Sequence, residues 1–523
     1  MTAFGHSWGK RDFPAILLFL AIPAVLIIRE NNTIFWYSDT VRVITISLSL
    51  LFCFITIPFL KKNPVKYISP SILLTTSGFL LVTIISSTLA DYPFRNIARL
   101  TELFSLTMLA LYIRAAVVEG LISILLVPIS MVVTLGVLLL GIANYWGQIP
   151  DPQLNHWVSK LPFFNNIRHL GYILAILSPI GFILWENGES NRKLRWLSII
   201  FSCLCWSLLI WSGGRGAALA TIVVIVLYAC LRPKCLIWII PTMLMAALIA
   251  EYFRIDQGSL DLFRTFREFN EQTFGINELS SNRMKIYSDS LQIWWQEGFW
   301  LGLGADAFRF INPPIVSASF VHPHSVIVQS LFNYGLIGTL ILTVILFQYI
   351  YRVIKCYSKS TLIYALPVIA ATINGATDGV FYHAISLFYF AILVATSFHK
   401  KANVKKDYVP DFNKAIYSFL RITISTTLLL TSLAAAMLAI QIYNAKKPVS
   451  EPYASWNSNY PIYYNAYYWA VNLSEQHSSS IDLMAVTASR YSQHPCMVIN
   501  EASNNVREKF LPNCRGNNAK KGN

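Results

Sequence analysis

Residues 326–351 read VIVQSLFNYGLIGTLILTVILFQYIY, a stretch without a single charged side chain. An α-helix rises about 1.5 Å per residue, so this stretch can cross the hydrocarbon core of a bilayer, which is roughly 30 Å thick. Basic residues follow it at Arg352, Lys355 and Lys359, as is typical of a span that ends on the cytoplasmic side. The stretch therefore predicts a membrane-spanning helix.

Similar apolar stretches recur along the whole chain of 523 residues. Hydrophobic residues make up 55% of the sequence and charged residues only 13%, against roughly 25% charged residues in soluble proteins. This composition excludes a cytosolic enzyme, a disordered chain and a secreted disulfide scaffold. We expect an all-α, polytopic helical membrane protein with about 12–13 transmembrane helices. The predicted spans are 13–28, 43–60, 72–90, 97–116, 119–146, 170–185, 196–211, 216–231, 235–250, 326–351, 362–379, 380–398 and 419–442.

Basic residues indicate how the spans are oriented. The net charge of +15 would suggest nucleic acid as the partner of a soluble protein. Here the basic residues occupy short loops between alternate spans, so we expect contact with membrane lipids and no nucleic-acid partner. Lys10 and Arg11 precede the first apolar stretch, and no small-residue cleavage pattern follows it, which favours an uncleaved first span. The predicted cytoplasmic loops contain Lys61, Lys62 and Lys66; Arg192, Lys193 and Arg195; Arg232 and Lys234; and Lys400, Lys401, Lys405 and Lys406.

Two polar segments are long enough to fold outside the membrane. Residues 251–325 are predicted to form an outward loop with membrane-surface helices, between the spans of 1–250 and those of 326–442. Residues 443–523 are predicted to form a small helical tail on the same side. The tail contains Cys496 and Cys514, which an oxidising compartment would join in a disulfide. Two unrelated free thiols are the alternative.

A glycine-rich turn, Trp211-Ser-Gly-Gly-Arg215-Gly, separates two predicted spans on the outward side. Glycine permits positive φ angles and close approach of backbones. The free N–H groups at the start of the next helix, with Arg215 beside them, would bind an anion. A tight turn with an interfacial arginine is the alternative.

The segment after Ser280 has the spacing of an amphipathic helix lying on the membrane. Its apolar positions recur at helical intervals. Arg283 falls in the first turn, where a cation opposes the helix dipole, so the position suggests a partner for the charge. A snorkelling surface arginine is the alternative. The predicted apolar face consists of Met284, Tyr287, Leu291, Trp294 and Trp295.

Two histidines stand immediately before the 326–351 span, in the sequence His322-Pro-His324-Ser. A helix N-terminus disfavours the imidazolium ion, so a neutral ring able to accept a proton is expected there. Metal binding by the pair and a purely structural role are the alternatives. Further arginines, histidines and an aspartate occur at the same outward ends, and the resulting face suits an anionic substrate. These secondary residues are Arg95, Arg99, Arg168, His169, Asp378 and His383.

The ordered set of motifs over about 205–340 resembles the O-antigen ligase/polymerase superfamily, which includes lipopolysaccharide O-antigen ligases and bacterial protein O-oligosaccharyltransferases. The resemblance rests on the Gly-Gly-Arg-Gly turn and on Ser, Tyr, Leu and Trp at the family's spacing in 281–294. It continues through Gly302-Leu-Gly304 and through His-Pro-His-Ser and the later Gly-Leu-Ile-Gly of 322–338. A looser similarity extends to Arg168-His169 and to 378–383.

The resemblance implies an inverting, metal-independent glycosyl transfer without a cofactor, on the periplasmic face of the bacterial inner membrane. A glycan leaves undecaprenyl diphosphate for an acceptor hydroxyl. The diphosphate-binding arginines of the family fall on Arg215 and Arg283, and its loop histidine falls on His324, the predicted general base. His322 is the competing candidate. One departure is Ser325, where family members commonly have asparagine.

The acceptor separates the branches of the superfamily. The sequence Asp378-Gly-Val-Phe-Tyr-His383 and the outward tail favour the branch that glycosylates Ser or Thr of a pilin-like protein. Ligation onto the lipid A core, and then glycan polymerisation, are the alternatives. A transporter of lipid-linked glycan is an alternative from another class, but transporters place ionisable groups near the membrane midplane on repeated halves. Here the charges lie at one face and no repeat is visible.

Overall fold

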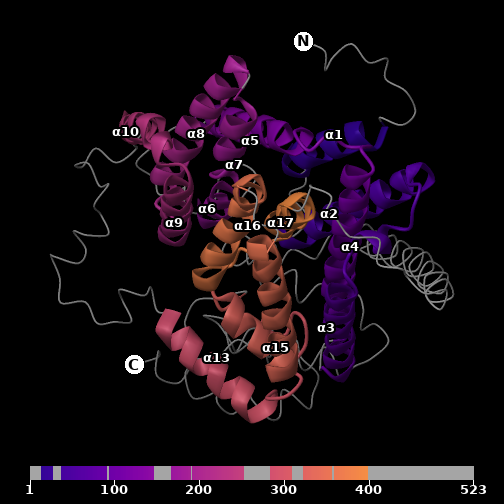
Figure 1. Cartoon of the computed structure of the whole chain (residues 1–523). Helices are drawn as coiled ribbons and strands as arrows, with labels where there is room; N and C mark the ends of the chain where they lie inside the picture. Colours follow the sequence, from indigo (N-terminus) through magenta and orange to yellow (C-terminus); the bar gives the residue numbers. More distant parts are fainter. Residues whose placement is uncertain are drawn as a thin grey trace, which may run out of the picture.

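The computed structural model describes residues 13–27, 37–90, 93–146, 167–189, 191–252, 283–308, 322–355 and 359–397. Within these ranges every regular element is a helix (Figure 1). Eight helices are long and apolar enough to cross a membrane, and four shorter apolar helices accompany them in the described part of the chain. The prediction of an all-α polytopic membrane protein is confirmed. The predicted span 419–442 and the tail with Cys496 and Cys514 lie outside the described residues.

The first five helices form one side of the bundle (Figure 1). The loop between the second and third helices is fastened to the end of the fourth, because the Glu119 carboxylate accepts the backbone N–H groups of Lys61 and Lys62 at 2.7 and 3.0 Å. Ser69 caps the third helix, accepting the N–H of Ile72 with its hydroxyl. These helices are α1 (Phe13–Ile27), α2 (Tyr37–Thr56), α3 (Pro70–Leu89), α4 (Pro93–Val118) and α5 (Leu126–Trp146).

The next five helices form the other side. The predicted span 170–185 is two helices, which separate at Ser178-Pro179 because proline has no N–H to donate. The eighth helix ends at Gly213, whose φ of 64° gives the left-handed cap that glycine favours. The ninth begins directly after it, at Arg215. These helices are α6 (Ile167–Leu177), α7 (Ile180–Asn187), α8 (Arg192–Ser212), α9 (Arg215–Leu231) and α10 (Leu236–Tyr252).

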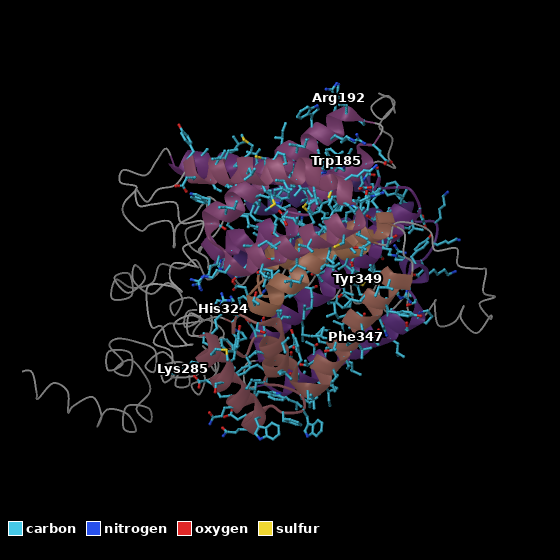
Figure 2. The ribbon with its side chains drawn as sticks, turned by 60° about the vertical axis from the view of Figure 1, so that its left-hand side comes forward. Trp185, Arg192, Lys285, His324, Phe347 and Tyr349 are labelled. Atoms are coloured by element: carbon cyan, nitrogen blue, oxygen red, sulfur yellow. The ribbon has the colours of Figure 1, made fainter. Side chains whose placement is uncertain are left out.

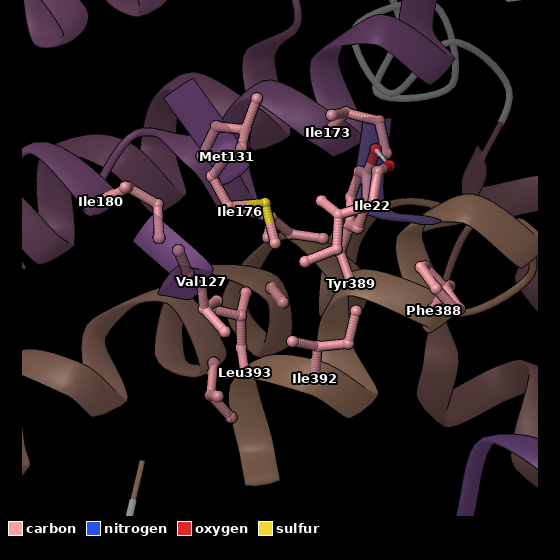
Figure 3. Close-up of a cluster of buried hydrophobic side chains, with 14 of the residues drawn as sticks. Ile22, Val127, Met131, Ile173, Ile176, Ile180, Phe388, Tyr389, Ile392 and Leu393 are labelled. Carbon is pink, nitrogen blue, oxygen red and sulfur yellow. Dashed lines mark hydrogen bonds between the residues drawn. The ribbon is translucent and has the colours of Figure 1, made fainter. Parts of the chain in front are cut away.

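The last three described spans are α15 (Val326–Lys355), α16 (Lys359–Thr377) and α17 (Ala384–Ser397). Helices α16 and α17 occupy the middle of the bundle, between the two sides (Figure 1). The core is continuous around them. Figure 3 shows Ile22 of α1, Met131 of α5 and Ile176 of α6 gathered around Tyr389 of α17, whose hydroxyl donates to the Ile22 carbonyl at 2.9 Å. Helix α17 is therefore held by helices from both sides.

Helix α15 is not the uninterrupted span that 326–351 predicts. It breaks at Gly335, where φ is 66° and ψ is −170°. A loop packs into the break, and a Cβ on Gly335 would lie 2.3 Å from the Trp300 carbonyl oxygen. The loop also bonds the freed backbone groups: Leu336 N–H donates to Phe299 at 2.8 Å, and Leu303 N–H donates to Phe332 at 2.8 Å. Irregular backbone within a membrane domain is stable only when protein satisfies it in this way.

The predicted surface helix is α13 (Arg283–Glu297), which lies beside the first part of α15, below the rest of the bundle in Figure 1. On the packed face of α13, Ile286 is buried in a cluster with Phe308 and Phe332. The predicted apolar face is divided: Met284 and Trp295 are 50% and 66% exposed, whereas the other members of that face are partly buried. Helix α13 thus both packs on α15 and presents large apolar side chains outward.

Candidate functional site

Three separate segments converge on Asp378, at the junction of α16 and α17. The Tyr172 hydroxyl of α6 donates to Asp378 Oδ1 at 2.6 Å, and the Gly379 N–H donates to the same oxygen at 2.9 Å. His324 Nδ1 lies 2.9 Å from that oxygen. Arg283 Nη2, at the start of α13, lies 3.2 Å from Oδ2. The carboxylate is 8% exposed, so it acts as a buried hub that links α6, α13 and the loop before α15.

The contacts of Asp378 determine which nitrogen of the neutral His324 ring carries the proton. Burial by itself would raise the pKa of Asp378, but the hydrogen bond and charge of His324, together with the charge of Arg283, hold it well below the usual range. A carboxylate in this state only accepts hydrogen bonds. His324 must then donate from Nδ1, which leaves Nε2 without a proton whenever the ring is neutral.

The His324 ring is neutral at ordinary pH. Burial lowers its pKa below the usual value, and the hydrogen bond and charge of Asp378 offset only part of that effect. The neutral state matters because only an unprotonated Nε2 can accept a proton. The pair therefore has the arrangement of a general base with an orienting carboxylate.

His324 is held in an unusual backbone conformation, with a φ of 56°. Non-glycine residues adopt this left-handed region only where the surroundings impose it. Two contacts do so here: the Tyr287 hydroxyl donates to the His324 carbonyl at 3.0 Å, and the His324 N–H donates to Nδ1 of His322 at 3.1 Å. The conformation aims the ring at Asp378.

His322 supports this loop from inside the protein. It is 3% exposed, and a Cβ on Gly379 would lie 2.1 Å from its ring Cε1. Its Nδ1 accepts a backbone N–H, so Nε2 carries the proton of the neutral ring. His322 is thus placed as a support for His324 rather than as a second base. As regards the metal alternative, no group of three or more His, Cys, Asp or Glu is placed to hold a metal ion among the described residues.

The turn that carries Arg215 is fastened beside the same hub. A Cβ on Gly216 would lie 2.7 Å from the Thr377 hydroxyl, and a Cβ on Gly171 would lie 3.9 Å from the Gly214 Cα. Arg283 Nη1 donates to the Thr377 carbonyl at 2.5 Å. The exposed Arg215 and the partly exposed Arg283 therefore both adjoin the end of α16, immediately before Asp378.

The secondary residues divide into two groups. Arg168 is exposed at the start of α6. The rings of His169 and His383 lie beside the hub with centroids 3.7 Å apart and planes tilted by 48°. Arg99 lies near the start of α4, at the predicted end of that span, and its side chain is buried. It is 3% exposed, because its guanidinium is enclosed by Glu102 and by the backbone of 381–382. The side chain of Arg95 lies outside the described residues.

The structure also brings in residues that sequence reasoning missed. Tyr172 follows Arg168 by four positions, so it lies on the same face of α6, and this spacing could have identified it. Tyr287 was assigned to the membrane-facing side of α13, but its hydroxyl reaches the His324 loop. Glu102 follows Arg99 by three positions, a helical spacing that could have indicated their ion pair. No local pattern could have indicated Arg42, because its partners Glu102 and Asp306 are distant in sequence.

All these groups lie toward one end of the spans. Figure 2 shows Lys285 and His324 on one side of the molecule, and Trp185, Arg192 and Tyr349 on the other. A helix of 21 residues, α8, connects Arg192 to the Arg215 turn, which is about the length of a membrane crossing. The site is therefore at one end of the spans, opposite the basic Arg192 loop.

Comparison with known families agrees with this geometry. Residues 196–343 match the family model described as O-antigen ligase. The match supports the O-antigen ligase/polymerase superfamily for this segment. It includes Arg215, Arg283 and His324, whereas Asp378 lies beyond it. No curated protein matches the chain.

The family match confirms the resemblance to the O-antigen ligase/polymerase superfamily. It indicates a multi-pass membrane enzyme of the glycosyltransferase-like ligase/polymerase type. The family implies a lipid-linked glycan and an acceptor as substrates.

Proposed function

We propose that the protein transfers a glycan from undecaprenyl diphosphate to an acceptor hydroxyl at the periplasmic face of the bacterial inner membrane. One observation carries this proposal: the Asp378 contact assigns the proton of neutral His324 to Nδ1 and leaves Nε2 as an acceptor, with Arg283 on the same carboxylate. The family match supports the substrate class, and the position of the hub at one end of the spans supports a reaction at the interface.

The proposed reaction is a single displacement. His324 Nε2 takes the proton of the acceptor hydroxyl as its oxygen attacks the anomeric carbon of the donor sugar. The bond from that carbon to the diphosphate oxygen breaks, and undecaprenyl diphosphate leaves with the bonding electrons. Attack opposite the leaving group inverts the anomeric configuration. Asp378 stabilises the imidazolium that forms, and proton transfer of this kind contributes about 10²–10⁴-fold in rate.

Arg215 and Arg283 hold the diphosphate in this proposal. A guanidinium stays charged at all relevant pH values and binds phosphate oxygens through a planar pair of N–H groups. Fixed positive charge at the leaving group stabilises the charge that develops there. The proposal includes no metal ion, since the arginines supply the neutralising charge. In addition, Asp378 and His322 orient His324, so Ser325 can replace the usual asparagine of the family.

For the acceptor, we propose Ser or Thr of a pilin-like protein, based on the sequence of 378–383. Ligation onto lipid A core is the second candidate, favoured by the description of the matching family. The test uses the purified protein in lipid nanodiscs with EDTA, a lipid-linked glycan, and a pilin-like protein, lipid A core or glycan as acceptor. Mass spectrometry identifies the product.

Modification of the protein acceptor supports the proposal. If only lipid A core is modified, the protein is a ligase, and if only glycan is modified, it is a polymerase. Either result overturns the proposed protein acceptor. Absence of transfer to all three acceptors, by protein that still binds the donor, overturns it, as does transfer that EDTA abolishes and Mg²⁺ restores.

A further inference from the structure

A second charged cluster lies buried against the segment 378–383. Arg99 and Glu102 of α4 form an ion pair. Arg42 of α2 places Nε 3.0 Å from Glu102 Oε2 and Nη1 3.6 Å from Asp306 Oδ2. The four side chains are at most 3% exposed. The cluster thus ties the outward ends of α2 and α4 to the loop that packs into the α15 break.

The two positive and two negative charges of this cluster balance. Such a buried ion-pair cluster is weak evidence for stability, because removing charges from water offsets most of their attraction. A well-packed apolar cluster would hold these helices equally well. What distinguishes the ion-pair cluster is that its hydrogen bonds hold particular backbone groups in place.

Arg99 is the member that reaches the functional site. Its Nη2 donates to the Phe381 carbonyl at 2.6 Å, and its Nη1 points at the Tyr382 carbonyl at 3.4 Å. The guanidinium also lies 5.8 Å from the centroid of the Tyr382 ring. A hydrogen bond of 2.9 Å from Tyr382 N–H to Gly379 O closes the turn after Asp378. Arg99 thus holds the far end of the turn that Asp378 begins.

We infer that Arg99 is a positioning residue, which fixes the 378–383 turn so that Asp378 remains on Nδ1 of His324. This inference rests on the proposed function. The positioning by Arg99 depends on the shape of its guanidinium as well as on its charge. A planar fork can donate to Glu102 and to two carbonyls at once, whereas an ammonium group lacks that fork.

The decisive variant is Arg99→Lys, which keeps the cluster electrically neutral. We expect kcat for transfer to fall roughly 10- to 100-fold, which is the order that a displacement of about 1 Å costs a catalytic constellation. The KM for the donor should change less than twofold, because Arg215 and Arg283 remain. The matched control is Arg232→Lys, since Arg232 binds Glu186 at 2.7 Å far from the turn, and it should leave both constants unchanged.

The pH dependence of kcat/KM distinguishes a displaced Asp378 from a smaller amount of folded protein in the Arg99→Lys variant. Asp378 raises the pKa of His324 relative to burial alone. Displacing Asp378 therefore lowers that pKa, and the acid limb of kcat/KM moves to lower pH while the plateau falls. Misfolding would lower the whole profile without moving the limb. Among the described residues, the other titratable and charged groups around His324 are His322 of its own loop, Arg283 and Tyr287 of α13, Arg168, His169 and Tyr172 of α6, and His383 before α17.

A reduced kcat with a shifted acid limb in Arg99→Lys alone supports the inference. A wild-type kcat, or a reduced kcat with an unmoved limb, overturns it. His324→Ala is measured in parallel. If that variant is inactive while Arg99→Lys behaves as wild type, only the positioning role fails. If His324→Ala transfers glycan at the wild-type rate, the proposed function itself fails.

Discussion

An arginine faces a carboxylate at each end of the spans, and the two pairs behave differently. Arg232 binds Glu186 through both Nε and Nη2, at 3.1 and 2.7 Å, and the Tyr228 hydroxyl donates to the same carboxylate at 2.9 Å. This pair is a closed bidentate contact. It fastens the start of the α9–α10 connection to the end of α7.

Arg283 approaches Asp378 with one nitrogen only, at 3.2 Å, and gives another N–H to a backbone carbonyl. The carboxylate divides its capacity among an arginine, a tyrosine, a backbone N–H and a histidine. This sharing leaves His324 with an unprotonated nitrogen. An arginine–carboxylate pair thus forms a closed anchor when its hydrogen bonds are mutual, whereas a carboxylate that is shared can also orient a histidine.

The strongest test of this contrast is His324→Ala. The variant should lose about 10²–10⁴-fold in transfer rate, since it lacks the base, while donor binding persists. His324→Gln keeps some hydrogen bonding but has no basic nitrogen, so it should be similarly impaired. Transfer is measured with lipid-linked glycan, and donor binding is measured separately in nanodiscs. Near-normal rates in His324→Gln would show that the ring only binds substrate.

A second test converts the shared carboxylate into an amide by Asp378→Asn. The amide can donate to Nδ1 and so place the proton of His324 on Nε2, the wrong nitrogen for a base. In a serine-protease triad the equivalent change costs up to about 10⁴-fold, and we expect a loss of at least 10²-fold here.

The residual activity of Asp378→Asn should also respond differently to pH. The negative charge that raises the pKa of His324 is gone, so the acid limb should move to lower pH. A full rate with an unchanged limb would contradict the orienting role of Asp378. The matched control is Glu186→Gln, which removes the carboxylate of the other pair.

The third test concerns the arginines. Arg215→Lys keeps the charge but loses the planar fork, so transfer should fall roughly tenfold, and Arg215→Ala should be lower still. Since Arg215 is exposed, neither change should alter the thermal stability of the protein. Wild-type transfer by stably inserted Arg215→Ala protein would refute the diphosphate assignment, whereas Arg232→Ala should leave transfer intact.

The smallest expected effect is that of Glu186→Gln. Its pair is partly exposed, at 36% for Arg232 and 20% for Glu186, so the loss of stability should be about 1 kcal/mol or less. The transfer rate should remain that of the wild type. Thermal unfolding in detergent measures the loss of stability, and the transfer assay measures the rate. A large loss of activity would mean that this end of the bundle is coupled to the site.

The sequence by itself determined the membrane class and the approximate positions of the twelve described spans, because hydropathy over a window of about 20 residues is a local property. It also singled out Arg215, Arg283, His324 and Asp378 as candidate site residues. Each of these residues stands next to a local signal, such as a glycine turn, a helix start or a span boundary.

Only the tertiary structure decided what these residues do to one another. Tyr172 and Asp378 are 206 positions apart, and Arg99 reaches the carbonyl of a residue 282 positions away. The break at Gly335 likewise depends on a loop that fills it. The physical reason is that hydrogen bonds and ion pairs form between groups a few ångströms apart in space, and the order of residues along the chain does not specify those distances.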